Sequence, residues 1–159
     1  ATKVIVECLR NGGKIMFCGN GGSASNAQHL SAELVGRYMK NRKPLASVAL
    51  TTDTSIITAI SNDLSFDNIF SRQVESIGSE GDILYAISTS GKSQNIINAI
   101  KVAKKLNIKT LGITGSDDSS FKKICDLVIS VPASRPDRIQ EMHIAVGQII
   151  CEILEEELC

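Results

Sequence analysis

The chain has 159 residues, enough for one domain in which helices cover both faces of a sheet. Its 17 lysines and arginines balance 17 aspartates and glutamates, which excludes a general electrostatic attraction to nucleic acid, to an anionic membrane or to an acidic partner. Five scattered cysteines without a CxxC pair, and the lack of an apolar run of roughly 20 residues, exclude a disulfide framework and a membrane span and favour a cytosolic protein.

A helical pattern opens the chain, because Val4, Ile5 and Leu9 recur near helical spacing before the stop signal Gly12-Gly13. Since the first residue already belongs to this pattern, we expect that helical residues preceding it have been lost. Short β-branched runs then alternate with longer amphipathic stretches, as in parallel βαβ sheets. The predicted strands span residues 14–18, 46–50, 82–87, 109–114 and 127–131. The predicted helices span residues 24–38, 55–61, 67–77, 93–106, 119–125 and 136–157.

This order of elements predicts an α/β fold, a three-layer sandwich with a five-stranded parallel sheet flanked by helices. No internal repeat, low-complexity tract or linker interrupts the chain, although residues 40–44 (KNRKP) form a short basic loop. We therefore expect a single domain over residues 1–159.

Two loops rich in glycine or serine each follow a predicted strand and open a predicted helix. In the first, Cys18-Gly19-Asn20-Gly21-Gly22-Ser23, the glycines let backbone N–H groups approach an anion at the helix N-terminus. The loop is neither a dinucleotide-binding fingerprint nor a P-loop, since it lacks their glycine spacing and the final Gly-Lys-Ser/Thr. A tight turn in which Ser23 merely caps the helix is the alternative interpretation.

The second loop, Ser88-Thr89-Ser90-Gly91-Lys92-Ser93, adds side-chain hydroxyls to the backbone donors of its helix start. A serine-rich helix cap is the alternative, although a cap needs only one of these hydroxyls. Because the carboxyl ends of parallel strands meet at one edge of a sheet, we expect both loops to contribute to one phosphate-binding site there.

Candidate catalytic residues lie on the predicted helix after the first loop. His29 and Glu33 are four residues apart and project from one helix face, so they can bind a metal or pair a base with the group that orients it. Arg37 follows four residues later, where it can neutralise the carboxylate or a substrate oxygen. An ordinary surface contact is the alternative for all three.

Two further polar segments, Asn62-Asp63 and the Asp137-Arg138-Ile139-Gln140 start of the last helix, can act as capping devices. Together with the loops they carry a resemblance: CGNGGSAxxAQHxxAEL, TTDTS, SND, ISTSGKS and DRIQEMH resemble the landmarks of the phosphoheptose isomerases, a branch of the sugar isomerase (SIS) family. The match spans the chain from about Lys14 to its end. It implies a single flavodoxin-like SIS domain that binds a sugar phosphate and no nucleotide.

The resemblance also implies roles for individual residues. The hydroxyl-bearing loop is expected to hold the phosphate. Substrate contacts are implied for Asn20, Gly21, Gly22, Ser23, Glu33, Arg37, Asn62, Asp63, Ser88, Thr89, Ser90, Ser93, Asp137 and Gln140. A Zn²⁺ site is implied at His29, Glu33, Gln140 and Gln148, and the catalytic set comprises Glu33 as the base with His29 and Gln148.

The sequence departs from the family at Gln148, where phosphoheptose isomerases have a histidine that binds metal and takes part in proton transfer. Glutamine cannot titrate near neutral pH, but its carbonyl oxygen can accept a hydrogen bond or weakly coordinate a metal. The only other histidine, His143, is not assigned the missing role. Because one proton-transfer group typically contributes about 10²–10⁴-fold in rate, this departure leaves a slow enzyme or none.

The first functional hypothesis is an aldose–ketose isomerase that converts sedoheptulose 7-phosphate to D-glycero-D-manno-heptose 7-phosphate through an enediol, for lipopolysaccharide or capsule precursors. One alternative is a non-catalytic SIS module, similar to the proteins that associate with the bacterial replication initiator. A sugar-phosphate sensor without turnover is the other. Glu33, which the initiator-associating proteins lack, favours the enzyme.

A homotetramer is a further implication of the resemblance. It is consistent with an apolar stripe along the final helix, because that much apolar surface needs more than one covering layer. Burial of the whole stripe within its own subunit is the alternative. The stripe consists of Ile139, Met142, Val146, Ile149, Ile150 and Ile153.

Overall fold

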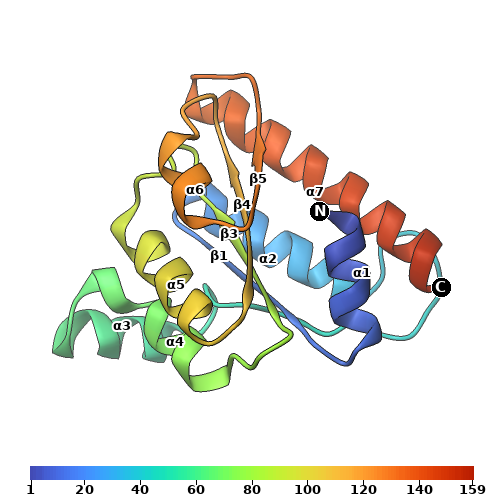
Figure 1. Ribbon diagram of the computed structural model, residues 1–159, viewed down its shortest axis with the longest axis horizontal. Helices are drawn as coiled ribbons and strands as arrows, with labels where there is room; N and C mark the ends of the chain where they lie inside the picture. Colours follow the sequence, from blue (N-terminus) through green and yellow to red (C-terminus); the bar gives the residue numbers. More distant parts are fainter.

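Five parallel strands form the central sheet of the computed structural model, which describes residues 1–159 (Figure 1). They are β1 (Ile15–Gly19), β2 (Ser47–Ala49), β3 (Ile83–Ile87), β4 (Lys109–Thr114) and β5 (Leu127–Ser130). Their order across the sheet is β2-β1-β3-β4-β5, the order of flavodoxin-like folds. Because Gly19 at the end of β1 pairs with Ile87 at the end of β3, the loops that follow these strands leave the sheet at the same edge.

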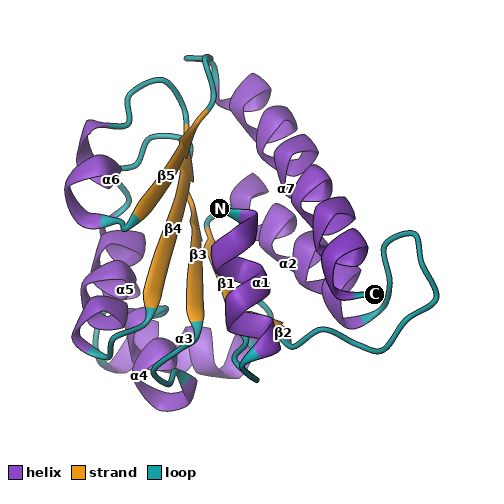
Figure 2. Ribbon diagram, turned by 45° about the vertical axis from the view of Figure 1, so that its right-hand side comes forward, coloured by secondary structure: helices purple, strands orange, loops and turns teal.

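One face of the sheet is covered by α1 (Thr2–Arg10), α2 (Gly22–Val35) and α7 (Pro136–Leu158). Alternate residues of the strands point toward this layer, so Phe17 and Tyr85 pack in one cluster with Leu30 of α2. In both views α2 and α7 run next to each other (Figures 1 and 2). They run in the same direction, since Asn26 near the start of α2 bonds to the carbonyl oxygen of Gln140 near the start of α7.

The opposite face is covered by α3 (Thr54–Asp63), α4 (Ser71–Ile77), α5 (Gln94–Lys105) and α6 (Ser119–Ile124). Met16, Leu84 and Ala86, the residues that alternate with those of the first face, are completely buried against this layer. The sheet is therefore the middle of three layers (Figure 2), which confirms the predicted fold class.

The prediction of one continuous helix over residues 67–77 is wrong, because the structure has two separate elements there. A 3₁₀ turn, η1 (Phe66–Asn68), is followed by α4, and Ile69 and Phe70 between them are buried in the core. The carbonyl oxygen of Asp67 accepts a hydrogen bond from Asn98 of α5 at 3.0 Å, so it is held by a neighbouring helix and not by a continuing turn.

The helix predicted over residues 24–38 is also too long, because α2 ends at Val35. Gly36 leaves the helical conformation, with φ −78° and ψ −98°, and the backbone N–H groups after it bond to a carboxylate on α7. Arg37 consequently lies outside the helix and does not share a helical face with Glu33, contrary to the four-residue spacing argument.

The apolar stripe predicted on α7 divides into two parts. Ile139 and Ile150 are buried, whereas Met142 and Ile149 are 44% and 54% exposed. One part faces the sheet and the other faces outward. None of the helices combines the length and the apolar character that a membrane span requires.

Candidate functional site

The loops after β1 and β3 are joined by a pair of side-chain amides. Nδ2 of Asn20 donates to Oδ1 of Asn95, and Nδ2 of Asn95 donates to Oδ1 of Asn20, both at 2.9 Å. Asn95 lies in the first turn of α5 and is only 2% exposed. The two loops thus meet at the carboxyl edge of the sheet, as predicted, and this contact fixes their relative position.

The start of α7 packs against the glycine loop. Gly21 has a φ of +56°, a conformation that favours glycine, and it precedes the first residue of α2. A Cβ on Gly22 would lie 2.6 Å from Cδ of Gln140, so only glycine lets that side chain rest on the loop. The structure brings Asn20, Gly21, Gly22 and Gln140 together, whereas Ser23 is buried.

The Ser/Thr loop uses some of its hydroxyls to hold its own shape. Oγ of Ser88 accepts from the N–H of Gly91 at 3.1 Å and lies 3.4 Å from Oγ of Ser93, and Gly91 has a φ of +62°. Oγ of Ser90 accepts from the N–H of Lys92 at 3.2 Å. Ser88 is buried and Ser90 is exposed, so Ser90 is the more accessible donor.

A hollow of about 210 Å³ opens beside the Ser/Thr loop. At this hollow Nζ of Lys92 lies 2.7 Å from Oδ2 of Asp117, and both side chains are mostly exposed. The hydroxyls around it come from three successive loops at this edge of the sheet. Its lining comprises Thr89, Ser90, Lys92, Ser116, Asp117, Ala133, Ser134, Pro136 and Ile139.

His29 and Glu33 form a contact of their own further along α2. Nε2 of His29 lies 2.9 Å from Oε1 of Glu33, and the side chains are 49% and 19% exposed. Glu33 is eleven residues after Gly22, which is a rise of about 16 Å along the helix. It faces α7: burial, and secondarily the nearby Glu33 carboxylate, raise the pKa of the Cys151 thiol to about 12.

The remaining predicted residues are not gathered around this pair. Asn62 and Asp63 are exposed at the end of α3, where Nδ2 of Asn62 donates to Oδ1 of Asp63 at 2.7 Å. Asp137 is exposed in the first turn of α7, and the hydrogen bond from Arg135 at 2.8 Å lowers its pKa. Arg37 is exposed after the end of α2.

Two residues of α7, Gln148 and His143, bear on whether this helix supplies a group that can transfer protons. Gln148 is half-buried one turn before Cys151, on the helix that Glu33 faces. His143 is buried, and neither of its ring nitrogens has a hydrogen-bond partner. Burial lowers the pKa of His143, and the nearby carbonyl of Thr114 offsets this shift in part. His143 is therefore a neutral core residue at pH 7. No three side chains of the His, Cys, Asp or Glu types gather in one place.

Asn95 is a residue of the candidate site that the sequence analysis missed. It follows the predicted hydroxyl loop by two positions and precedes the buried Ile96. An amide on the apolar face of a helix must find a partner, because a buried polar group without one is costly. That signal was available in the sequence, but the identity of the partner was not.

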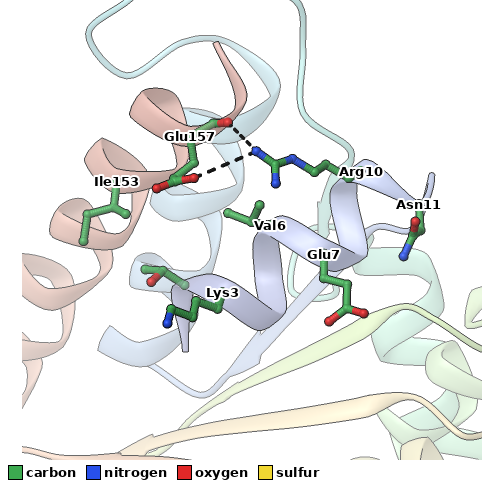
Figure 3. A pocket seen from close by; sticks show the side chains of 8 residues that line it. Lys3, Val6, Glu7, Arg10, Asn11, Ile153 and Glu157 are labelled. Carbon is green, nitrogen blue, oxygen red and sulfur yellow. Dashed lines mark hydrogen bonds and ion pairs between the residues drawn. The ribbon is translucent and has the colours of Figure 1, made fainter.

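A second hollow, of about 500 Å³, lies between α1 and α7 and contains none of the predicted site residues (Figure 3). Nη2 of Arg10 bridges the two helices by donating to the carbonyl oxygen of Glu157 at 2.8 Å. The labelled residues that line it are mainly charged and polar: Lys3, Val6, Glu7, Arg10, Asn11, Ile153 and Glu157.

Comparisons with known proteins agree with this arrangement. The sequence model of the SIS domain family matches residues 1–115. A phosphoheptose isomerase of Rhodospirillum rubrum is 52% identical over 159 residues, which cover 100% of this chain and 85% of that relative. Solved structures of phosphoheptose isomerases from Neisseria gonorrhoeae (44% identity, TM-score 0.90) and Francisella tularensis (39% identity, TM-score 0.93) are also similar, and each match covers 98% of this chain and 83% of the other.

Proposed function

The chain belongs to the SIS domain family, among its phosphoheptose isomerases, and we propose that it interconverts sedoheptulose 7-phosphate and D-glycero-D-manno-heptose 7-phosphate. The observation that carries this proposal is the junction of the glycine loop and the Ser/Thr loop at one sheet edge through Asn20 and Asn95. Gln140 lies against Gly22 of the glycine loop, on one side of this junction. We further propose that the heptose product serves lipopolysaccharide or capsule synthesis, and that the enzyme works in the cytoplasm, where its five free thiols stay reduced.

Glu33 is the residue best suited to act as the base. It takes a proton from C1 of the ketose while the carbonyl oxygen gains one; the enediol then gains a proton at C2 as the C1 hydroxyl loses its own. His29 orients the carboxylate through the 2.9 Å contact between Nε2 and Oε1. The net result is an aldose, and no redox cofactor is consumed.

We also propose a weak Zn²⁺ site at His29 and Glu33. An imidazole nitrogen and a carboxylate are ordinary zinc ligands, whereas the amide oxygens of Gln140 and Gln148 are poor ones, so the donor set fits zinc with low affinity. When bound there, zinc would polarise the sugar carbonyl. His29 and Glu33 already face each other, so one ion can reach both side chains.

The hydroxyls of the exposed Ser90 and the half-buried Ser93 are the proposed phosphate ligands. Replacing Ser90 and Ser93 together with alanine is expected to raise KM for the sugar phosphate by at least about 10-fold, because a single hydrogen bond to a charged group already contributes about 1.5–3 kcal/mol. Ser79→Ala, an exposed serine near the opposite edge of the sheet, is the matched control. An unchanged KM in the double variant would show that the phosphate binds elsewhere.

We propose that the enzyme is a homotetramer in which the Ser/Thr loop of one copy lies next to Glu33 of another. Within one chain the glycine loop is about 16 Å from Glu33 along α2, and Gln140 is about 12 Å from Gln148 along α7. Within one chain a single ion at His29 and Glu33 therefore cannot also reach Gln140. The exposed Met142 and Ile149 of α7 give this face an apolar surface for a second copy.

Subunit mixing tests the shared site. A Glu33→Gln chain and a Ser90→Ala/Ser93→Ala chain, co-expressed with different tags and purified as a mixed assembly, are expected to regain activity at low substrate concentration. The gain arises because intact halves from the two chains form one complete site. Mixed assemblies no more active than their parents, or sedimentation of the wild type as a compact monomer at micromolar concentration, would contradict the proposal.

The second candidate function is a non-catalytic SIS module that binds a sugar phosphate or a protein partner. The single observation that favours it is Gln148, which removes a titratable group from α7. The retained Glu33 and its contact with His29 favour the isomerase.

A further inference from the structure

The segment after α2 is held by a buried ion pair that lies outside the predicted site. Nε of Arg42 lies 2.8 Å from Oε1 of Glu155, and both side chains are only 2% exposed. The Glu155 carboxylate also accepts three backbone N–H groups, those of Tyr38, Met39 and Lys40, at 2.7 to 2.9 Å. Burial alone would raise the pKa of Glu155, but these donors and Arg42 outweigh it and lower the pKa to about 2.

The guanidinium of Arg42 also caps the carboxyl end of α2. Its Nη2 donates to the carbonyl oxygen of Glu33 at 2.7 Å, and its Nη1 donates to that of Leu34 at 2.8 Å. These are two of the last carbonyls of the helix, which have no partner within it. A buried cation at this end also matches the helix dipole.

This cap stands at the turn that carries the proposed base. Glu33 is two residues from the end of α2, where helices normally fray. Arg42 bonds to the backbone of Glu33 itself, and Glu155 fixes Arg42 to α7, the helix that carries Gln148. One ion pair therefore connects the backbone of the base to the helix it faces.

We propose that Arg42 and Glu155 are positioning residues for Glu33, which set the rate of proton transfer and leave the affinity for the sugar phosphate unchanged. The proposal rests on the proposed function, because it takes Glu33 as the base. It follows from the cap: without it the last turn of α2 loosens, and a displacement of about 1 Å in a reacting group can cost 10²-fold in rate. None of the hydrogen bonds of this pair goes to the Ser/Thr loop, so the proposed phosphate contacts are spared.

The chain offers a matched control for the loss of a buried carboxylate. Asp82 has a side chain only 4% exposed and accepts from the N–H of Lys14, from Nζ of Lys14 and from the N–H of Ser79 at 2.6 to 2.9 Å. It lies immediately before β3, at the edge of the sheet opposite to the two loops. Asp82→Asn and Glu155→Gln therefore remove similar charges, and only the second affects the end of α2.

The test compares Glu155→Gln, Arg42→Lys and Asp82→Asn at a temperature at which all three are folded. Lysine keeps the charge at position 42, but all its donors leave one nitrogen and cannot reproduce the fork by which three nitrogens of Arg42 reach Glu155 and the two carbonyls. We expect kcat to fall by about 10²-fold in the first two variants, with KM within about twofold of the wild type, and kcat to be unchanged in Asp82→Asn. A wild-type kcat in Glu155→Gln and Arg42→Lys, or an equal fall in Asp82→Asn, would overturn the proposal.

Hydrogen exchange separates this proposal from the isomerase assignment. Amides of residues 33–36 are expected to exchange faster in Glu155→Gln and Arg42→Lys than in the wild type, and at the wild-type rate in Asp82→Asn. If no form of the protein turns over sedoheptulose 7-phosphate, the proposed function fails, and the exchange rates alone decide whether the pair holds the turn of Glu33. Unchanged exchange in both variants would overturn the positioning role whatever the activity.

Discussion

Replacing Glu33 with glutamine is expected to lower the isomerisation rate by about 10²–10⁴-fold, the usual contribution of a general base. The amide preserves the size of the side chain and a hydrogen bond to His29, but it cannot accept a proton near neutral pH. Phosphate binding should persist, because the substitution leaves the Ser/Thr loop intact. Turnover of sedoheptulose 7-phosphate and its dissociation constant, measured on the same preparation, separate the two effects.

Glu75→Gln is the control for the loss of one carboxylate from a helix. Glu75 is exposed on α4, on the opposite face of the sheet, and its carboxylate lies 3.1 Å from Arg72 at i,i+3 spacing. This variant should retain wild-type turnover. If Glu33→Gln turned over as fast as Glu75→Gln, another group would have to be the base.

Replacing Gln148 with histidine is expected to tighten zinc binding and to raise the isomerisation rate by about 10²–10⁴-fold, because imidazole supplies a group that titrates near neutral pH. Imidazole nitrogen is also a much better zinc ligand than an amide oxygen. Zinc content after dialysis, followed by rate measurements with and without added zinc, tests both parts of the expectation.

Lys105→His provides the comparison for an added imidazole. Lys105 is exposed at the end of α5, away from both loops, so a histidine there should change neither zinc content nor rate. A Gln148→His protein that holds zinc but remains as inactive as an inactive wild type would favour the non-catalytic SIS module. Restored activity would identify position 148 as the cause of slow turnover.

The fold could be predicted because its strands carry a strong local signal. Residues 83–87, Ile-Leu-Tyr-Ala-Ile, are all buried, as expected for a strand covered on both faces. The position of the two loops then followed from topology, since parallel strands place their carboxyl ends at one edge. The spacing of His29 and Glu33 predicted their contact for the same reason, because residues four apart meet on a helix.

Features that depend on distant partners could not be predicted. The ion pair between Arg42 and Glu155 joins residues 113 positions apart, and the surrounding letters KNRKP are typical of an exposed basic loop. The end of α2 at Val35 depends on the same pair, because Glu155 binds the N–H groups that would otherwise continue the helix. The separation of Glu33 from the glycine loop likewise became visible only when helix length was converted into distance.

The amide pair of Asn20 and Asn95 has a consequence for how the pH dependence of the enzyme is read. Neither side chain gains or loses a proton in the working range, so the junction of the two loops has the same charge and the same hydrogen bonds in acid and in base. The contact between these two side chains therefore does not titrate. The pH–rate profile of this protein will therefore carry no contribution from the contact that joins the two loops.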